Sequence, residues 1–275
     1  MKNEERSAKK ILPRQPFLTY FHRWAHLFVP FKKALTLDKA KKASFLLHLS
    51  SLNRTFAPMN YKAALFDLDG VVFDTEPQYS IFWGNQCRHY HPEIPGLENM
   101  IKGQTLTQIY DKWFSGPLLD EQKVITDRLN DYEANMDYVY VEDFERFIQE
   151  IRSRGVRTAV VTSSNQPKMN AVYRKHPEFK SLFDEILTSE DFTASKPAPD
   201  CYLQAAARFG LKPDECVVFE DSFNGLKSGR SAQMTVVGLA TTNPAEDISP
   251  LSDVVIPDYK DFDYEKMCGI VASSR

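Results

Sequence analysis

The sequence changes from apolar to acidic at Leu65-Phe66-Asp67-Leu68-Asp69-Gly70-Val71-Val72-Phe73-Asp74-Thr75-Glu76. Residues 61–66 are mostly apolar and bounded by charge, which is typical of a buried parallel strand. Side chains two positions apart in an extended segment point the same way. We therefore expect Asp67 and Asp69 to project into one space beyond the carboxyl end of that strand. Gly70 then allows the backbone to leave at an angle that a residue with a Cβ would resist.

Two carboxylates this close repel each other unless a cation lies between them or one of them holds a proton. Either arrangement suits catalysis, because a metal-clamped aspartate can attack phosphorus while a second aspartate exchanges protons with the reacting oxygens. Acids followed by glycine also occur in ordinary turns and in calcium loops. The strand before the pair and residues 71–75 after it favour a catalytic role for Asp67 and Asp69.

Three further motifs follow in chain order: Thr162-Ser163-Ser164 after an apolar run, Lys196 before Pro197, and Glu220-Asp221 after a second apolar run. With these four motifs, spread over residues 61–240, the chain resembles the haloacid dehalogenase superfamily. Within it, the chain is most similar to the branch of beta-phosphoglucomutase and its phosphatase relatives. The resemblance implies an enzyme that moves a phosphoryl group through an aspartyl-phosphate intermediate.

The second and third motifs are candidates for phosphate binding. Thr162 and the backbone N–H of Ser163 lie where a strand gives way to a helix, and a helix N-terminus favours a phosphate dianion. Lys196 is held in extended geometry by the following proline, so its ammonium can pair with phosphate and nucleophile. N-capping without a ligand and an ordinary surface lysine are the alternatives. Because the other motifs flank them, we predict phosphate binding by Thr162, Ser163 and Lys196.

The acids of the fourth motif predict a magnesium site. Mg²⁺ prefers six oxygen ligands and keeps some of its waters, so a few carboxylates and a carbonyl are sufficient. The resemblance implies that Asp67 and Asp221 ligate through side chains, Asp69 through its carbonyl, and Glu220 directly or through water. An acidic helix N-terminus, stabilised by the helix dipole alone, is the weaker alternative.

The pattern of elements predicts an α/β fold with an inserted helical domain. From residue 77 to 138 apolar residues recur at helical spacing, and the resemblance implies that these helices form a cap over the site. Residues 59–76 and 139–275 alternate between strands and helices, which predicts a doubly wound parallel sheet of Rossmann-like type. Ligands of such sheets bind beyond the carboxyl ends of the strands.

One loop of the predicted cap is a candidate for substrate specificity. Lys102-Gly103-Gln104-Thr105 interrupts the helical pattern. The resemblance implies that this loop reaches toward the substrate, which makes Lys102, Gln104 and Thr105 candidate specificity residues. A turn that merely connects two helices is the equal alternative.

The remaining features limit which cellular compartment and which binding partners we expect. The four cysteines are scattered and form no CxxC motif, which favours a reducing, cytoplasmic compartment. No apolar run is long enough for a membrane span. Residues 1–58 hold 12 Lys or Arg and 3 acidic residues, whereas the rest of the chain holds 22 and 34. Nucleic-acid binding has no motif to support it beyond that charge, and no feature indicates the oligomeric state.

The basic segment 1–58 has three interpretations. Basic residues interleaved with aromatic ones suit an amphipathic anchor on an anionic membrane surface. A targeting segment is the second possibility, although Glu4 and Glu5 and the missing cleavage site disfavour it. We favour a weakly ordered extension, or upstream sequence, because Met59 stands directly before the predicted catalytic strand.

The expected function is a magnesium-dependent phosphatase of a small phosphorylated metabolite, of which a sugar phosphate is favoured. Asp67 would attack phosphorus, and Asp69 would protonate the leaving alkoxide and then activate water. The resemblance implies that mutases carry a cap arginine and a histidine where this chain has Leu106 and Tyr79. Leucine cannot bind a second phosphate, so we favour a phosphatase, although Arg88 is a possible substitute for that arginine. A non-catalytic binding protein of the same fold is disfavoured by the intact motifs.

Overall fold

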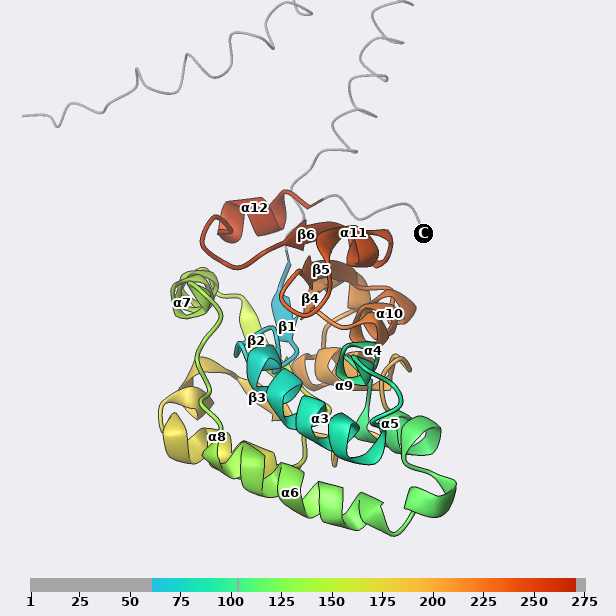
Figure 1. The fold of residues 1–275 in the computed structure, drawn as a ribbon. Helices are drawn as coiled ribbons and strands as arrows, with labels where there is room; N and C mark the ends of the chain where they lie inside the picture. The colour runs from blue at the N-terminus through green and yellow to red at the C-terminus, as the bar shows by residue number, and fades with distance from the viewer. Residues whose placement is uncertain (1–60, 103, 271–275) are drawn as a thin grey trace, which may run out of the picture. The chain divides into compact units, whose positions relative to one another are not determined.

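The computed structural model describes residues 61–102 and 104–270 (Figure 1). All of these belong to the second of the two units into which the chain divides, Pro58–Arg275. The basic extension predicted at residues 1–58 lies outside the described residues. The domain boundary expected at residue 59 therefore stays a prediction.

The core is a six-stranded parallel sheet with the strand order β3-β2-β1-β4-β5-β6. Its strands are β1 (Ala63–Phe66), β2 (Arg157–Val161), β3 (Glu185–Leu187), β4 (Cys216–Glu220), β5 (Thr235–Leu239) and β6 (Val254–Ile256). Strand β1 lies in the centre, where Phe66 pairs with Val160 of β2 and Phe219 of β4. This register brings the polar residues that follow the three strands to one edge of the sheet. The predicted doubly wound parallel fold is thereby confirmed.

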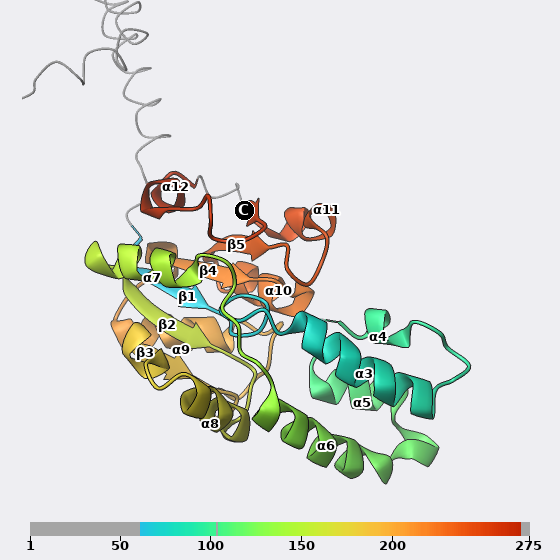
Figure 2. The same cartoon turned by 60° about the vertical axis from the view of Figure 1, so that its left-hand side comes forward.

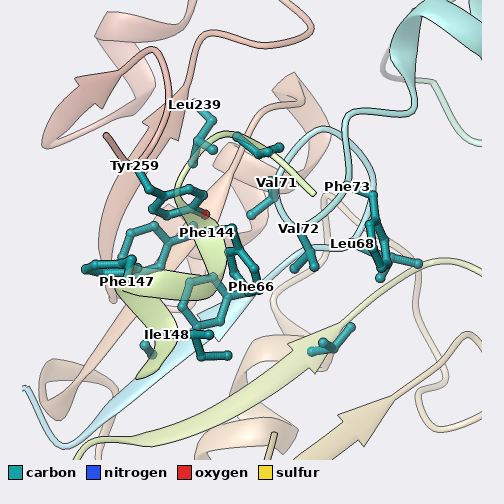
Figure 3. Close-up of a cluster of buried hydrophobic side chains, with 14 of the residues drawn as sticks. Phe66, Leu68, Val71, Val72, Phe73, Phe144, Phe147, Ile148, Leu239 and Tyr259 are labelled. Atoms are coloured by element: carbon teal, nitrogen blue, oxygen red, sulfur yellow. The ribbon is translucent and has the colours of Figure 1, made fainter. Parts of the chain in front are cut away.

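Both faces of β1 are buried, because its side chains alternate between two apolar clusters. Ala64 and Phe66 belong to one cluster, and Ala63 and Leu65 belong to the other. On the first face, the Phe66 ring stacks on Phe219 at 4.6 Å between centroids. Figure 3 shows Phe66 among the buried hydrophobic side chains of this cluster. Such aromatic pairs contribute about 0.5–1.5 kcal/mol beyond the apolar area that they bury. The continuous apolar run of β1 is therefore required by its central position.

Helices cover both faces of the sheet (Figures 1 and 2). The helices of the core are α7 (Phe144–Ser153), α8 (Gln166–Lys175), α9 (Asp200–Phe209), α10 (Phe223–Ser231), α11 (Ala245–Ile248) and α12 (Tyr264–Cys268). Buried residues of α7, α8 and α12 belong to the cluster that contains Phe66, and those of α9, α10 and α11 belong to the cluster that contains Leu65. The sheet is thus the middle layer of three.

Between β1 and α7 the chain forms the predicted helical cap. Its helices are α3 (Glu76–Tyr90), α4 (Leu97–Met100), α5 (Leu106–Trp113) and α6 (Glu121–Asn135). They share an apolar core of their own, which includes Phe82, Trp83, Ile109, Phe114 and Ile125. Figure 2 shows these helices gathered to one side of the sheet.

Two paired segments connect the cap with the core. The backbone N–H of Asp74 donates to the Val139 carbonyl at 2.8 Å, and that of Val141 donates to the Val72 carbonyl at 3.0 Å. One segment, residues 72–74, follows the acidic end of β1. The other, residues 139–141, leads back from the last cap helix to the core. The cap is therefore tied to the edge of the sheet that carries the polar motifs.

No helix within the described residues has both the length and the apolar character needed to cross a membrane. The longest of them, α3 and α6, have 15 residues each, whereas a spanning helix needs about 20 mostly apolar residues.

Candidate active site

Asp67 and Lys196 meet at the end of the central strand. Asp67 directly follows β1, and its backbone N–H donates to the Phe219 carbonyl at 3.0 Å. The Lys196 ammonium lies 2.6 Å from Asp67 Oδ1, and it also donates to the carbonyl of Val161 at 2.9 Å. Lys196 is buried, and the carboxylates of Asp67 and Glu220 raise its pKa although burial opposes this. A permanent cation is thus held against the candidate nucleophile.

Glu220 lies beneath this pair and is fully buried. Its Oε1 accepts hydrogen bonds from Lys196 at 2.7 Å and from the Tyr202 hydroxyl at 2.7 Å. Its Oε2 accepts from the Ser222 hydroxyl at 3.2 Å. A Cβ on Gly225 would lie 1.8 Å from Oε1, so glycine is needed there. Protein donors therefore contact both oxygens of Glu220, and one of these donors is the Lys196 ammonium.

Asp221 directly follows β4 and lies close to Gly70, in the loop that follows Asp67. The Thr242 hydroxyl donates to Asp221 Oδ2, and the Asn243 amide donates to the Asp221 carbonyl at 2.9 Å. Gly70 has φ +69°, and a Cβ there would lie 2.1 Å from Asp221 Oδ2. The first motif therefore ends in glycine because the backbone must both turn and pass close to this carboxylate.

The three acids fit an oxygen-ligated cation. Oxygen atoms of Asp67, Glu220 and Asp221 all lie within 4.8 Å of one another. Burial and the nearby carboxylates raise the pKa of Asp67 from 3.8 to about 7, although Lys196 opposes the rise. Burial and the carboxylates of Glu220 and Asp67 raise the pKa of Asp221 well above its usual value. Uncompensated negative charge among oxygen donors suits a hard divalent ion such as Mg²⁺.

Asp69 is held by groups from three segments. The Thr75 hydroxyl donates to its Oδ1 at 2.7 Å, and the Ser164 hydroxyl lies 3.3 Å from its Oδ2. The ammonium of Lys168, on α8, also donates to Oδ2. The carboxylates of Asp69 and Glu133 outweigh burial and raise the pKa of Lys168. Asp69 thus faces a cation different from the one that faces Asp67.

The loop after β2 leaves Thr162 and Ser163 available to a ligand. Helix α8 is capped by Asn165, whose side chain accepts from the backbone N–H of Lys168 at 3.1 Å. The Thr162 hydroxyl accepts from the backbone N–H of Ser164 at 3.0 Å. Helix capping, the alternative role considered for this motif, is thus performed by Asn165 at its end, and phosphate binding by Thr162 and Ser163 stays a prediction.

A cavity of about 420 Å³ lies between the core and the cap. The predicted site residues that line it are Asp67, Asp69, Lys102, Gln104, Thr105, Thr162, Ser163, Lys196 and Asp221. Glu220 does not line it. The cap side adds apolar residues, among them Trp83, Leu106 and Ile109. The structure thus brings the four motifs and the candidate specificity loop to one space.

The three candidate specificity residues also contact the cap itself. The Lys102 ammonium lies 3.8 Å from Glu76 Oε2, and the Gln104 amide donates to the Met100 carbonyl at 2.7 Å. The Thr105 hydroxyl accepts from the backbone N–H of Gln108 and caps α5. The loop therefore begins a helix and lines the cavity, and the specificity role of its residues stays a prediction.

Sequence reasoning missed Lys168, Tyr202 and Thr242. Lys168 had one local signal, because a lysine in the first turn of a helix opposes the helix dipole and so needs another reason to be there. Tyr202 and Thr242 had no such signal. They act on Glu220 and Asp221 through contacts between segments far apart in the sequence.

Comparisons with known proteins agree with this geometry. A family model described as haloacid dehalogenase-like hydrolase matches residues 61–233. The probable pseudouridine-5'-phosphatase of Drosophila melanogaster is 27% identical over 211 residues, which cover 74% of this chain and 91% of the relative. The beta-phosphoglucomutase of Mycobacterium bovis is also 27% identical, over 73% of this chain and 91% of the relative. Sequence identity alone therefore does not separate the two reactions.

Solved structures share the fold. The crystal structure of a HAD hydrolase of family IA, variant 3, from Entamoeba histolytica superimposes with a TM-score of 0.67 at 22% identity. The match covers 77% of this chain and all of that chain. At this identity, the likeness concerns the arrangement of sheet and cap.

Proposed function

The chain belongs to the haloacid dehalogenase-like hydrolases, and from this premise we propose that it is a magnesium-dependent phosphatase of a small phosphorylated metabolite. A sugar phosphate is the favoured substrate, in keeping with the cap cavity of about 420 Å³. The observation that carries the proposal is the half-buried Asp67, whose carboxylate contacts the Lys196 ammonium and lies within 4.8 Å of a second carboxylate, Asp221. This is the environment in which a carboxylate oxygen can attack phosphorus.

In the first half of the reaction, Asp67 attacks the phosphorus and the bond to the leaving oxygen breaks. Asp69 gives a proton to that oxygen, so the alcohol leaves neutral. Lys196 and the donors of Thr162 and Ser163 stabilise charge on the transferred group. In the second half, Asp69 takes a proton from water, and the water oxygen displaces Asp67 from phosphorus. The products are the alcohol and inorganic phosphate.

The metal ligands would be the carboxylates of Asp67 and Asp221 and the backbone carbonyl of Asp69. Glu220 would support them from below or through water, since its oxygens already accept hydrogen bonds. A bound Mg²⁺ would supply positive charge that offsets the phosphate and keeps the Asp67 carboxylate ionised.

The cavity supports a phosphatase over a mutase. Leu106 and Tyr79 line it at the positions where the mutase pattern has cations. Among the described residues that line the cavity, the basic ones are Lys102, Lys168 and Lys196, and each lies beside a carboxylate. Arg88 is not among the lining residues, and its guanidinium donates to Asn85. Lys196 is assigned to the transferred phosphate and Lys168 contacts Asp69, so Lys102 is the one described lining cation left for a second phosphate, and it lies 3.8 Å from Glu76.

The test is hydrolysis of 4-nitrophenyl phosphate by the full chain, with and without MgCl₂, compared with Asp67→Asn. We expect Mg²⁺-dependent release of phosphate by the wild type and a loss of at least about a thousandfold in the variant, because the nucleophile is removed. Thermal unfolding of the variant should show a folded protein. Hydrolysis that survives in Asp67→Asn would refute the assigned nucleophile.

A screen of sugar phosphates and nucleotides would then identify the substrate class. The same protein should not convert a sugar 1-phosphate to its 6-phosphate in the presence of glucose 1,6-bisphosphate. If this conversion outpaces hydrolysis, the chain is a mutase.

A further inference from the structure

A buried lysine joins the candidate proton donor to the cap. Lys168 lies in the first turn of α8 and is only 4% exposed. Its ammonium donates to Asp69 Oδ2 and to the Tyr79 hydroxyl, the latter at 2.5 Å. It also lies 3.9 Å from Glu133 Oε1. Side chains from three other segments thus meet at the Lys168 ammonium.

The partners come from both sides of the cavity. Asp69 belongs to the loop after β1, whereas Tyr79 lies on α3 and Glu133 on α6 of the cap. The Tyr79 hydroxyl donates to Glu133 at 2.7 Å, which closes the network within the cap. Helices α6 and α8 pack against each other along this contact. The position of the cap and the position of the Asp69 carboxylate are therefore linked through Lys168.

The contact with Lys168 determines how firmly Asp69 is held. One carboxylate oxygen is fixed by the Thr75 hydroxyl at 2.7 Å. Apart from Lys168, the other oxygen has the Ser164 hydroxyl at 3.3 Å. A charge-assisted hydrogen bond is roughly twice as strong as a neutral one, so removal of the ammonium frees the carboxylate to rotate.

We propose that Lys168 is a positioning residue that holds the Asp69 carboxylate in line with the leaving oxygen and couples this alignment to the closed cap. The inference rests on the proposed function, because the orientation of Asp69 matters only if Asp69 donates the proton. Lys168 itself stays out of the chemistry. Its loss affects both proton transfers of Asp69, to the leaving oxygen and from water, and spares the attack by Asp67.

The dependence of rate on the leaving group distinguishes this role from a merely structural one. A poorly basic leaving group departs without a proton, whereas a strongly basic one needs protonation. The probes are 2,4-dinitrophenyl, 4-nitrophenyl and phenyl phosphate, whose leaving groups become steadily more basic. Each is assayed with the full chain at saturating MgCl₂.

For Lys168→Met we expect kcat/KM on phenyl phosphate to fall about 10- to 100-fold, since small misplacements of a catalytic group cost up to about a hundredfold. The kcat/KM on 2,4-dinitrophenyl phosphate should fall less than about threefold, because kcat/KM does not include the later hydrolysis of the intermediate that all three esters share. Lys168→Arg, which keeps the charge, should recover part of the loss on phenyl phosphate.

Lys175→Met is the matched control. Lys175 lies on the same helix and also reaches the end of the cap, with its ammonium 3.2 Å from the Asn135 carbonyl and 3.3 Å from Asp137. It does not contact Asp69. All three esters should be hydrolysed by this variant at wild-type rates.

A second variant separates stability from positioning. Lys168→Met leaves the buried Glu133 without its cation, which destabilises the fold. Lys168→Met/Glu133→Gln removes both charges and should regain thermal stability while the selective loss on phenyl phosphate remains.

Three results would overturn the inference. They are an equal loss of kcat/KM on all three esters in Lys168→Met, an unchanged kcat/KM on phenyl phosphate, or recovery of that kcat/KM together with stability in the double variant. If the wild type hydrolyses none of the esters with MgCl₂, the proposed function itself fails. That result is distinct from loss of the leaving-group dependence.

Discussion

At the scale of single residues, the site depends on glycines that let carboxylates come close. Gly70 combines a left-handed backbone with an approach to Asp221 that no Cβ allows. A Cβ on Gly225 would likewise collide with Glu220, although Gly225 has an ordinary φ. Both acids are buried, so neither can move toward solvent to make room. The glycines after the first and fourth motifs are thus parts of the candidate metal site.

Gly70→Ala should weaken magnesium binding as well as stability. The added Cβ would meet Asp221 Oδ2 at 2.1 Å, so the carboxylate or the loop must shift. We expect the MgCl₂ concentration for half-maximal hydrolysis of 4-nitrophenyl phosphate to rise at least about tenfold, because Mg²⁺ demands near-ideal geometry.

Gly210→Ala is the control for backbone strain. Its φ of +67° is close to that of Gly70, and a Cβ there meets nothing within 4 Å. Both variants should lose about 1 kcal/mol of stability from the left-handed conformation. An unchanged magnesium requirement in Gly70→Ala would count against the close approach seen at Asp221.

At the scale of elements, the start of α5 joins the cap loop, the cavity and the core. The Thr105 hydroxyl caps the backbone N–H of Gln108, and the Gln108 side chain accepts from the Thr105 N–H at 3.0 Å. The same side chain accepts from the Asn224 amide of α10 at 2.8 Å. The capping box thus fixes the loop that contains Lys102 and Gln104 and also contacts the core.

Thr105→Ala should therefore affect substrate binding more than its stability cost suggests. Loss of an N-cap costs about 1 kcal/mol. Because the loop faces the cavity, KM for the sugar phosphate found in the screen should rise at least about threefold with kcat little changed. Steady-state kinetics and thermal unfolding measure the two effects.

Asp263→Ala is the matched control, since Asp263 caps α12 by accepting from the backbone N–H of Lys266 at 2.7 Å. It does not line the cavity. This variant should lose similar stability and keep the wild-type KM. Equal KM values in the two variants would show that residues 102–105 do not contact the substrate.

At the scale of the whole molecule, the excess of buried acids makes stability depend on pH and metal. The folded state raises the pKa of Asp67 from 3.8 to about 7, and it raises that of Asp221 as well. The folded state therefore binds more protons than the unfolded state between pH 3.8 and about 7. Without metal, the contribution of these groups to stability falls as pH rises through that range.

Magnesium should reverse this loss most strongly at high pH. We expect MgCl₂ to raise the Tm of the full chain more at about pH 8 than at about pH 5.5, because protons compete with the metal at the lower pH. Asp221→Asn should raise the metal-free Tm at the higher pH and reduce the effect of MgCl₂. An equal increase in Tm at both pH values would contradict a metal site at these acids.

Much of the fold was predictable from local patterns. The apolar run before Asp67 predicts a buried strand, and parallel strands bring their carboxyl ends to one edge whatever the details of packing. Thr162 and Glu220-Asp221 therefore had to lie near Asp67 once the runs before them were strands of the same sheet. Helical spacing after Thr75 likewise predicts helices that bury apolar faces against one another.

The sequence by itself determined which acids end the central strands, because a strand that is buried on both faces can carry charge only at or beyond its end. The tertiary structure alone decided that Glu220 lies beneath Lys196 and outside the cavity, and that Lys168 reaches Asp69, Tyr79 and Glu133. The physical reason is that these contacts join side chains from separate elements. The contacts of Lys168 depend on how α6 and α8 pack, and that of Glu220 with Lys196 depends on how β4 and the loop before α9 meet, neither of which local spacing encodes.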